Sequence, residues 1–170
     1  VFVATGAAQS RRLGLEDEDA EGVYRAIEFL DAVARGEKVK LGKRVGVIEG
    51  GDSAIDSARV ALWLGVKEVI LIYRRSQVEL PAIPSEAEDA RQESIRFMML
   101  TAPTKLIPKN GVPKGVQCIR MCFGEEDLSG RRRPVPIPDS EFTVALDTLI
   151  VAIGQKAPEA KLLEELERTE

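Results

Sequence analysis

Residues 45–56 read V-G-V-I-E-G-G-D-S-A-I-D, and this short stretch decides the fold. Residues 45–48 are mostly apolar and predict a buried strand, and the glycines after them predict a tight turn. From Ser53 to Leu64 the sequence predicts a helix with mainly small apolar residues on one face, namely Ala54, Ala58, Ala61 and Leu62. Gly65 ends this helix, because glycine readily adopts the left-handed conformation that closes a helix.

The segments around this stretch predict more strands and helices. Residues 68–73 (E-V-I-L-I-Y) are continuously hydrophobic, which is typical of a strand covered on both faces, so strand, helix and strand form a parallel crossover. Residues 95–100 and 149–153 predict two further strands. An upstream helix is expected from the spacing of Val23, Ile27, Leu30, Val33 and Ala34, with Gly36 as its end. A second is expected through Gln92, opened by a capping box of Ser85 and Glu88.

The pattern of predicted elements changes between residues 102 and 143, a segment rich in Pro and Gly. Short strands are expected at 104–107, 115–123 and 141–144, with turns at 109–111 and 129–130. The fold class predicted is therefore α/β, a Rossmann-like three-layer domain with a central parallel sheet and an antiparallel β-meander.

Composition limits the possible functions. The chain has 170 residues and a net charge of -4 with both signs interspersed, so we expect no nucleic-acid partner. Arg131–Arg133 and the acidic run at 16–19 are both interpreted as solvated connections. No apolar stretch approaches the roughly 20 residues of a membrane span, so no membrane contact is expected. The first residue is Val1, and we expect a piece of a longer polypeptide.

The chain contains few side chains capable of catalysis. It has no histidine, which excludes every catalytic triad or metal site that depends on one. Cys118 and Cys122 lie four residues apart in an expected strand, too far for a disulfide, and on a shared buried face. A reduced, cytoplasmic setting is consistent with this cysteine usage. Redox chemistry would then belong to cofactors that the domain positions.

The glycine turn is arranged to bind phosphates but contains two acids. Backbone amides at the start of the helix suit a pyrophosphate, and the three small-residue positions of such a turn fall on Glu49, Gly51 and Ala54. A Glu49 carboxylate near a pyrophosphate would cost about 1 kcal/mol or more. Asp52 is expected to cap the helix and to compete with the phosphate for its amides. The site is therefore either weakened or has lost its cofactor.

Arg74 and Arg75 end the second strand, where an acid would bind the ribose of NAD. Two guanidinium groups suit the 2′-phosphate of NADPH instead, although two exposed arginines also end many strands. The turn Gly154-Gln155 follows the last strand and is expected near the nicotinamide. Asp56 either supports the glycine turn or is solvated.

These features resemble the NADPH-binding domain of the glutamate synthase small (beta) subunit family, which is of the pyridine nucleotide-disulfide oxidoreductase type. The resemblance rests on seven stretches of this sequence: V-A-T-G-A (3–7), G-V-Y-R-A-I-E-F-L (22–30), K-R-V-G-V-I-E-G-G-D-S-A-I-D-S-A-R (43–59), Y-R-R-S-Q-V-E-L-P-A (73–82), T-A-P (101–103), S-G-R-R-R-P-V-P-I-P-D-S-E-F-T (129–143) and D-T-L-I-V-A-I-G-Q (147–155).

The resemblance implies an NADPH domain inserted into an FAD domain. Residues 1–41 would connect from the flavin domain, residues 42–155 would form the NAD(P)H-binding domain, and residues 156–170 would lead back into the FAD domain. NADPH would reduce FAD, and electrons would pass through iron–sulfur clusters to a large partner subunit that makes glutamate. This chain lacks the FAD turn and the cysteine clusters, so we expect it neither to hold FAD nor to turn over alone.

The family turn reads G-G-G-N-T-A-M-D, so Glu49 replaces its first glycine and Asp52-Ser53 its Asn-Thr pair. Gln77 stands where a further arginine is common. The resulting set of expected NADPH-binding residues is Gly50, Gly51, Asp52, Ser53, Ala54, Asp56, Arg74, Arg75, Gly154 and Gln155. The alternative is a degenerate nucleotide domain with a structural or subunit-docking role.

Overall fold

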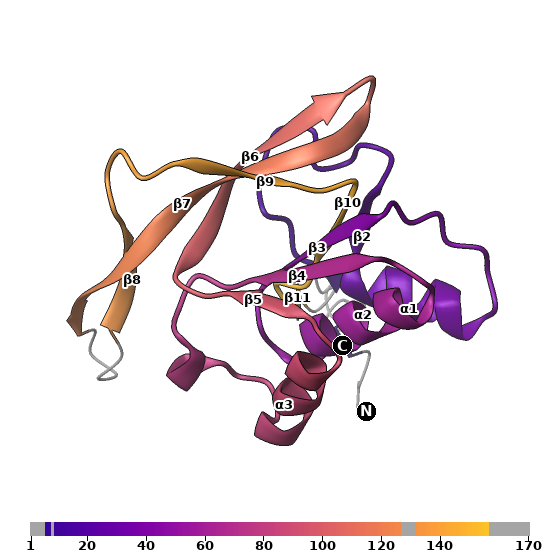
Figure 1. Cartoon of the computed structure of the whole chain (residues 1–170), viewed down its shortest axis with the longest axis horizontal. Coiled ribbons are helices and arrows are strands. Elements are labelled where there is room, and N and C mark those ends of the chain that lie inside the picture. Colours follow the sequence, from indigo (N-terminus) through magenta and orange to yellow (C-terminus); the bar gives the residue numbers. More distant parts are fainter. Residues whose placement is uncertain (1–5, 8, 127–131, 157–170) are drawn as a thin grey trace, which may run out of the picture.

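The computed structural model describes residues 6–7, 9–126 and 132–156, and its centre is a parallel sheet (Figure 1). The strand order of this five-stranded sheet is β2-β10-β3-β4-β5, with every neighbouring pair parallel. The strands are β2 (Val23–Arg25), β10 (Thr148–Val151), β3 (Arg44–Ile48), β4 (Glu68–Ile72) and β5 (Arg96–Met98). β3 and β4 are joined by helix α2 (Asp52–Trp63), so the predicted parallel crossover is confirmed.

Helices cover one face of this sheet, as Figure 1 shows. They are α1 (Ala26–Ala34), α2 and α3 (Pro84–Gln92). Alternate strand residues such as Val47 and Leu71 form one core cluster with Phe29 of α1 and Ala58 of α2, all buried. The small residues of α2 allow it to lie close to the sheet, because a short side chain separates the two backbones least.

An antiparallel sheet covers the other face. Strand β6 (Thr101–Lys109) turns through Asn110 and Gly111, both with positive φ, into the long strand β7 (Val112–Glu126). The first half of β7 also pairs with β9 (Phe142–Ala145), and its second half pairs with β8 (Arg132–Pro136). Side chains of this sheet form a second core cluster with the remaining faces of β3, β4 and β10. The predicted three-layer α/β class is confirmed.

A small third sheet joins distant parts of the chain. β1 (Gln9–Ser10) pairs antiparallel with β11 (Gln155–Lys156). The two connections that were expected to lead to the flavin domain therefore lie side by side. The expected strand and turn at 1–8, apart from residues 6 and 7, lie outside the described residues, as do the turn at 129–130 and the tail from residue 158.

Two expectations about helices were wrong. Val23 belongs to a strand, because it pairs with Leu149 at the edge of the parallel sheet. α3 begins at Pro84, whose fixed φ and missing N–H suit the first helical position, so Ser85 caps nothing. The capping box lies instead at Ser76 and Glu79, where it opens the one-turn helix η1 (Gln77–Glu79).

Two expectations about β7 and β8 were also wrong. Arg132 and Arg133 were expected in a loop but belong to β8. Cys118 is buried as expected, and burial raises its pKa to about 12, so the thiol stays protonated. Cys122 is exposed, because the second half of β7 leaves the core to pair with β8.

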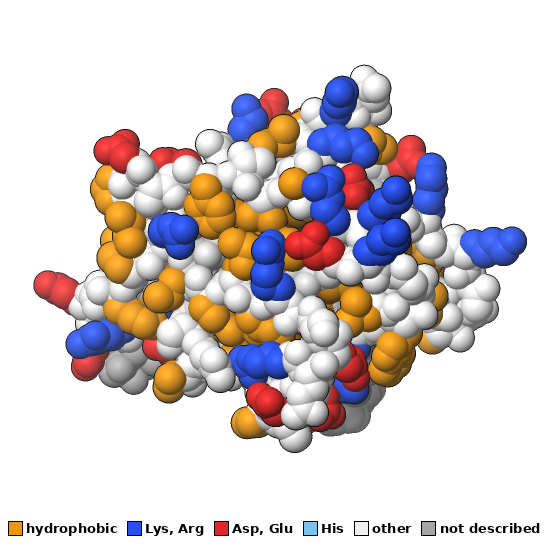
Figure 2. Space-filling model, in the orientation of Figure 1, with side chains coloured by type: hydrophobic (Ala, Val, Ile, Leu, Met, Phe, Trp, Pro, Cys, Tyr) orange, Lys and Arg blue, Asp and Glu red, His pale blue; other side chains and the backbone are white. Residues whose placement is uncertain are grey.

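The surface mixes charged and apolar side chains. In Figure 2, lysines and arginines alternate with acids and with exposed hydrophobic side chains. None of the helices in the described residues has the length and apolar character that a membrane crossing requires. Within the same residues, no three cysteine or acidic side chains are grouped so that they could hold a metal ion.

Candidate functional site

The turn between β3 and α2 leaves helix amides available. Gly51 is the N-cap of α2 with an extended backbone, and a Cβ added to it would meet no atom within 4 Å. The amides of Gly51, Asp52 and Ser53 donate no hydrogen bond to another described residue. The start of a helix carries a partial positive charge in addition to these donors. This arrangement can bind a phosphate group beside Gly51.

Gly50 is closely covered by side chains of the segment that follows β4. A Cβ at this position would overlap the Leu80 side chain and lie 3.3 Å from the Tyr73 ring. The Gly50 carbonyl also accepts a hydrogen bond from the Ala82 amide at 3.1 Å, and the Tyr73 hydroxyl donates to the Glu79 carbonyl at 2.7 Å. The segment after β4 is thereby fixed onto the glycine turn.

Asp52 does not cap the helix as expected. It is the first residue of α2, and its Oδ1 accepts a hydrogen bond from the Ile83 amide at 3.0 Å. The segment that precedes α3 lies beside the turn and supplies this donor. The Asp52 carboxylate therefore leaves the helix amides free for another acceptor, and the expected competition with phosphate was wrong.

Glu49 is the acid of the glycine turn that opposes the binding of an anion. Its φ is 88°, a left-handed conformation that favours glycine, as expected for the first glycine position of the turn. Its side chain is only 21% exposed, and Oε1 lies 3.2 Å from Nε of Arg74. Burial raises the pKa of Glu49, while Arg74 and Arg75 oppose the shift. An incoming phosphate must therefore compete with Glu49 for Arg74.

A cleft of about 630 Å³ lies where β3, β4 and β10 end, and we call it the carboxyl-edge cleft. Among its lining residues are Glu49, Gly51, Arg74 and Gly154. Ligands of open α/β sheets bind in a crevice outside the carboxyl ends of the strands. The position of this cleft is therefore the one that the fold predicts for a cofactor.

Several cleft residues were not identified from the sequence as site residues. They are Arg11, Arg12, Leu13, Pro81, and Thr101, Ala102 and Pro103. The last three are the T-A-P stretch, which served as a family marker without an assigned role. Their marker status was the only available signal, because nothing in their local pattern places them at the carboxyl edge of the sheet.

A second cavity, of about 680 Å³, adjoins the cleft, and we call it the arginine cavity. The two share Glu49, Arg74 and Pro81. The other lining residues are Tyr73, Arg75, Val78, Glu79, Leu80, Glu126 and Arg132. Arg74 and Arg75 are thus brought next to the glycine turn, although the sequence separates the two features.

The remaining expected site residues divide into two groups. Ser53, Gly154 and Gln155 border a small cavity of about 50 Å³ next to the cleft. Ala54 is fully buried and packs α2 onto the sheet, while Asp56 is exposed and lines none of these cavities. Asp56 therefore fits its solvated interpretation.

The acidic run before β2 holds one wall of the cleft and is not merely solvated. Glu18 is buried and accepts hydrogen bonds from the amides of Leu13 and Gly14 at 2.7 and 2.8 Å. It also pairs with Arg25. Burial alone would raise the pKa of Glu18, but the hydrogen bonds from Leu13, Arg25 and Gly14 outweigh it and lower the pKa. The same wall is tied to the turn before β11, since the Arg11 amide donates a hydrogen bond to the Gly154 carbonyl at 3.0 Å.

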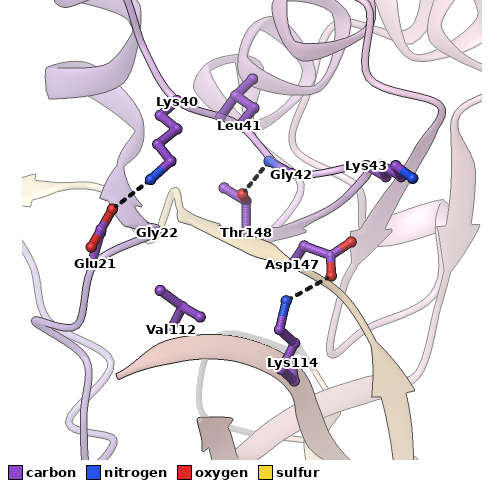
Figure 3. Close-up of a pocket in the computed structure, with 10 residues that line it drawn as sticks. All are labelled: Glu21, Gly22, Lys40, Leu41, Gly42, Lys43, Val112, Lys114, Asp147 and Thr148. Atoms are coloured by element: carbon purple, nitrogen blue, oxygen red, sulfur yellow. Dashed lines mark hydrogen bonds and ion pairs between the residues drawn. The ribbon is translucent and has the colours of Figure 1, made fainter. Parts of the chain in front are cut away.

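A third cavity, of about 460 Å³, lies at the opposite, amino-terminal edge of the parallel sheet. Figure 3 shows its lysines engaged with acids, Lys40 with Glu21 at 3.1 Å and Lys114 with Asp147 at 3.4 Å, while Lys43 points away from both pairs. The amino-edge cavity therefore has fewer unpaired polar groups for a ligand than the carboxyl-edge cleft has.

Comparison with known proteins identifies the family. Residues 1–169 match the pyridine nucleotide-disulphide oxidoreductase family. The chain is 46% identical over 159 residues to the NADPH-Fe(3+) oxidoreductase subunit beta of Geobacter sulfurreducens, covering 91% of this chain and 24% of that protein. It is 39% identical over 166 residues to the glutamate synthase (NADPH) small chain of Escherichia coli, covering 91% and 35%.

Among solved structures, FprA of Mycobacterium tuberculosis in complex with NADPH has the same fold, with a TM-score of 0.74 at 17% identity over 93% of this chain and 50% of that one. The chain thus spans about a quarter to a third of the curated relatives it matches. The chain belongs to the pyridine nucleotide-disulphide oxidoreductase family, within which it is similar to the glutamate synthase small chain and to the NADPH-Fe(3+) oxidoreductase beta subunit.

Proposed function

We propose that this chain is the NADPH-binding part of a flavoprotein oxidoreductase. The observation that carries the proposal is the junction of two cavities: Gly51, the N-cap of α2, lines one, and Arg74 and Arg75 line the other. A dinucleotide needs such a pair of sites, one for its pyrophosphate and one for the phosphate on its adenosine ribose. The names of both relatives above also include NADPH.

In this proposal the amides of Gly51, Asp52 and Ser53 bind the pyrophosphate. Arg75, together with Arg74 once it is released from Glu49, binds the 2′-phosphate. Gly154 borders the end of the cleft where the nicotinamide would lie, and Gln155 borders the small cavity next to that end. When bound, NADPH supplies a hydride, and the chain's own residues hold and orient it toward a flavin.

The flavin would come from flanking segments of the polypeptide. The pairing of β1 with β11 supports this, because two connections to one neighbouring domain are expected to run together. We further propose that electrons leave FAD through iron–sulfur clusters to a partner subunit, a glutamate-forming one if the protein works as the resemblance implies.

A second candidate is a degenerate domain that has kept the fold and lost the cofactor. The ion pair of Glu49 with Arg74 favours it, since the carboxylate occupies a guanidinium that a phosphate would need. In this case the domain would dock subunits or support the flavin domain.

Titration of the 170-residue chain with NADPH and with NADH distinguishes the two candidates. Amide chemical shifts of isotope-labelled protein report the site. Saturable NADPH shifts centred on Gly51, Ser53 and Arg75, at lower concentration than for NADH, support the cofactor role. No shift at millimolar NADPH would establish the degenerate alternative.

A further inference from the structure

The end of the β7–β8 ribbon contributes to the arginine cavity. β7 continues beyond the part that pairs with β6 and β9, and there it pairs with β8 alone, with Glu126 opposite Arg132. Figure 1 shows the ribbon extending away from the helical layer, toward the side of the one-turn helix that follows β4. Arg132 and Glu126 line the same cavity as Arg74 and Arg75.

The charges that border this cavity are unequally engaged. Of its three carboxylates, Glu49 pairs with Arg74, and Glu79 accepts from the Ser76 amide and hydroxyl at 3.1 and 2.5 Å. Arg75 and Arg132 form no ion pair with another described residue. Glu126 is the one carboxylate of the set that neither pairs with a described cation nor serves in the cap. The cavity thus retains two available guanidinium groups.

We infer that Arg132, which β8 brings to the arginine cavity, is a specificity residue for the 2′-phosphate of NADPH and acts there with Arg75. This inference rests on the proposed function. A phosphate has three acceptor oxygens, and guanidinium groups approaching from two directions can each bind it with paired hydrogen bonds. Because Glu49 already pairs with Arg74, Arg132 would replace Arg74 as a second guanidinium group available to the phosphate.

The strand itself provides a matched control. Successive side chains of a strand point to opposite faces, so Arg133 points away from the side that Arg132 faces, and it does not line the cavity. Both arginines are exposed and both belong to β8. Arg132→Ala and Arg133→Ala therefore remove the same charge from the same strand, and only the first removes it from the cavity.

The experiment measures binding of NADPH, NADH and adenosine 2′,5′-bisphosphate to the 170-residue chain by calorimetry. We expect Arg132→Ala to weaken NADPH and the bisphosphate about tenfold or more while leaving NADH unchanged, and Arg133→Ala to match the wild type. Arg132→Lys keeps the positive charge without the planar guanidinium group, so its NADPH affinity should lie between those of the wild type and Arg132→Ala. Equal thermal melting of the variants shows that they are folded.

Two results would overturn the inference alone: Arg132→Ala and Arg133→Ala weakening NADPH equally, or Arg132→Ala weakening NADH as much as NADPH. A wild-type chain that binds neither NADPH nor the bisphosphate would overturn the proposed function, and the role of Arg132 with it.

Discussion

The two edges of the parallel sheet have similar cavities and different chemistry. At the amino edge, Asp147 accepts from Arg44 at 3.3 Å and from Lys114 at 3.4 Å, and these contacts lower its pKa, the Arg44 contact most. The Gly42 amide there donates to the Thr148 hydroxyl at 2.9 Å. At the carboxyl edge, three helix amides and the Arg75 guanidinium have no such partner among the described residues.

The comparison shows that a cavity indicates a site only when its polar groups remain to be satisfied. In a parallel sheet each strand enters its helix at the carboxyl edge, so helix N-termini and their available amides gather there. At the amino edge no helix N-terminus of the described residues lines the cavity, and both of its acids, Glu21 and Asp147, are already paired with lysines. Glu49 is an exception at the carboxyl edge, because its carboxylate already pairs with Arg74, a cation that a phosphate would otherwise bind.

The largest expected effect is at Arg75. Charge-assisted hydrogen bonds to phosphate contribute about 1.5–3 kcal/mol, so Arg75→Ala should weaken NADPH binding about 10- to 100-fold and affect NADH far less. Calorimetric titration of both nucleotides measures the difference. Equal losses for the two would place Arg75 outside the 2′-phosphate site.

The next largest effect is expected on thermal stability, where substitutions of Gly50 and Gly51 should differ. Gly50→Ala forces a methyl group against Leu80 and Tyr73, and overpacking of this kind costs about 1–3 kcal/mol. For a domain of this size that lowers Tm by roughly 3–10 °C. Gly51→Ala, with open space around its Cβ and a negative φ, should melt like the wild type. Identical melting of the two variants in calorimetry would refute the packing role of Gly50.

Removing the Glu49 side chain should make the carboxyl edge a better site. Glu49→Gly relieves a left-handed backbone, releases Arg74 and removes a charge that costs a nearby phosphate about 1 kcal/mol, so NADPH should bind about fivefold more tightly. Glu49→Gln keeps the backbone conformation and removes only the charge. Unchanged or weaker NADPH binding in both variants would contradict the repulsion.

A smaller effect should appear in the pH dependence of binding. Because burial raises the pKa of Glu49, its carboxyl gains a proton at a higher pH than an ordinary glutamate. The neutral form does not repel phosphate, so the affinity of the wild type should approach that of Glu49→Gln as pH falls through the raised pKa, and fall behind it as pH rises. The ratio of the two dissociation constants cancels the titration of NADPH itself. A ratio independent of pH would contradict this linkage.

The smallest effect is expected at the amino edge. Strands of five residues, at about 3.3 Å per residue, separate the two edges by roughly 16 Å. That is about two Debye lengths at physiological salt. Lys40→Ala and Lys114→Ala should therefore leave NADPH affinity within about twofold of the wild type. A loss as large as that of Arg75→Ala would mean that the nucleotide binds at the other edge.

Much of the fold could be predicted because it is encoded locally. The apolar run at 45–48, the small-residue face of α2 and the apolar run at 68–73 each repeat over a few residues and fix a strand or a helix wherever they pack. Two of the wrong expectations involved a distant partner. Val23 became a strand through β10, and Cys122 became exposed through β8.

By itself, the sequence determined the parallel crossover, the glycine turn at its centre and the basic pair at the end of the second strand, because periodicity and turn chemistry act within neighbouring residues. Only the tertiary structure decided what those groups do. It bound Asp52 to an amide 31 residues away, paired Glu49 with Arg74, placed Leu80 over Gly50 and brought Arg132 to the same cavity. The physical reason is that these contacts depend on strand order and on the path of long connections, which side-chain patterns along the chain do not specify.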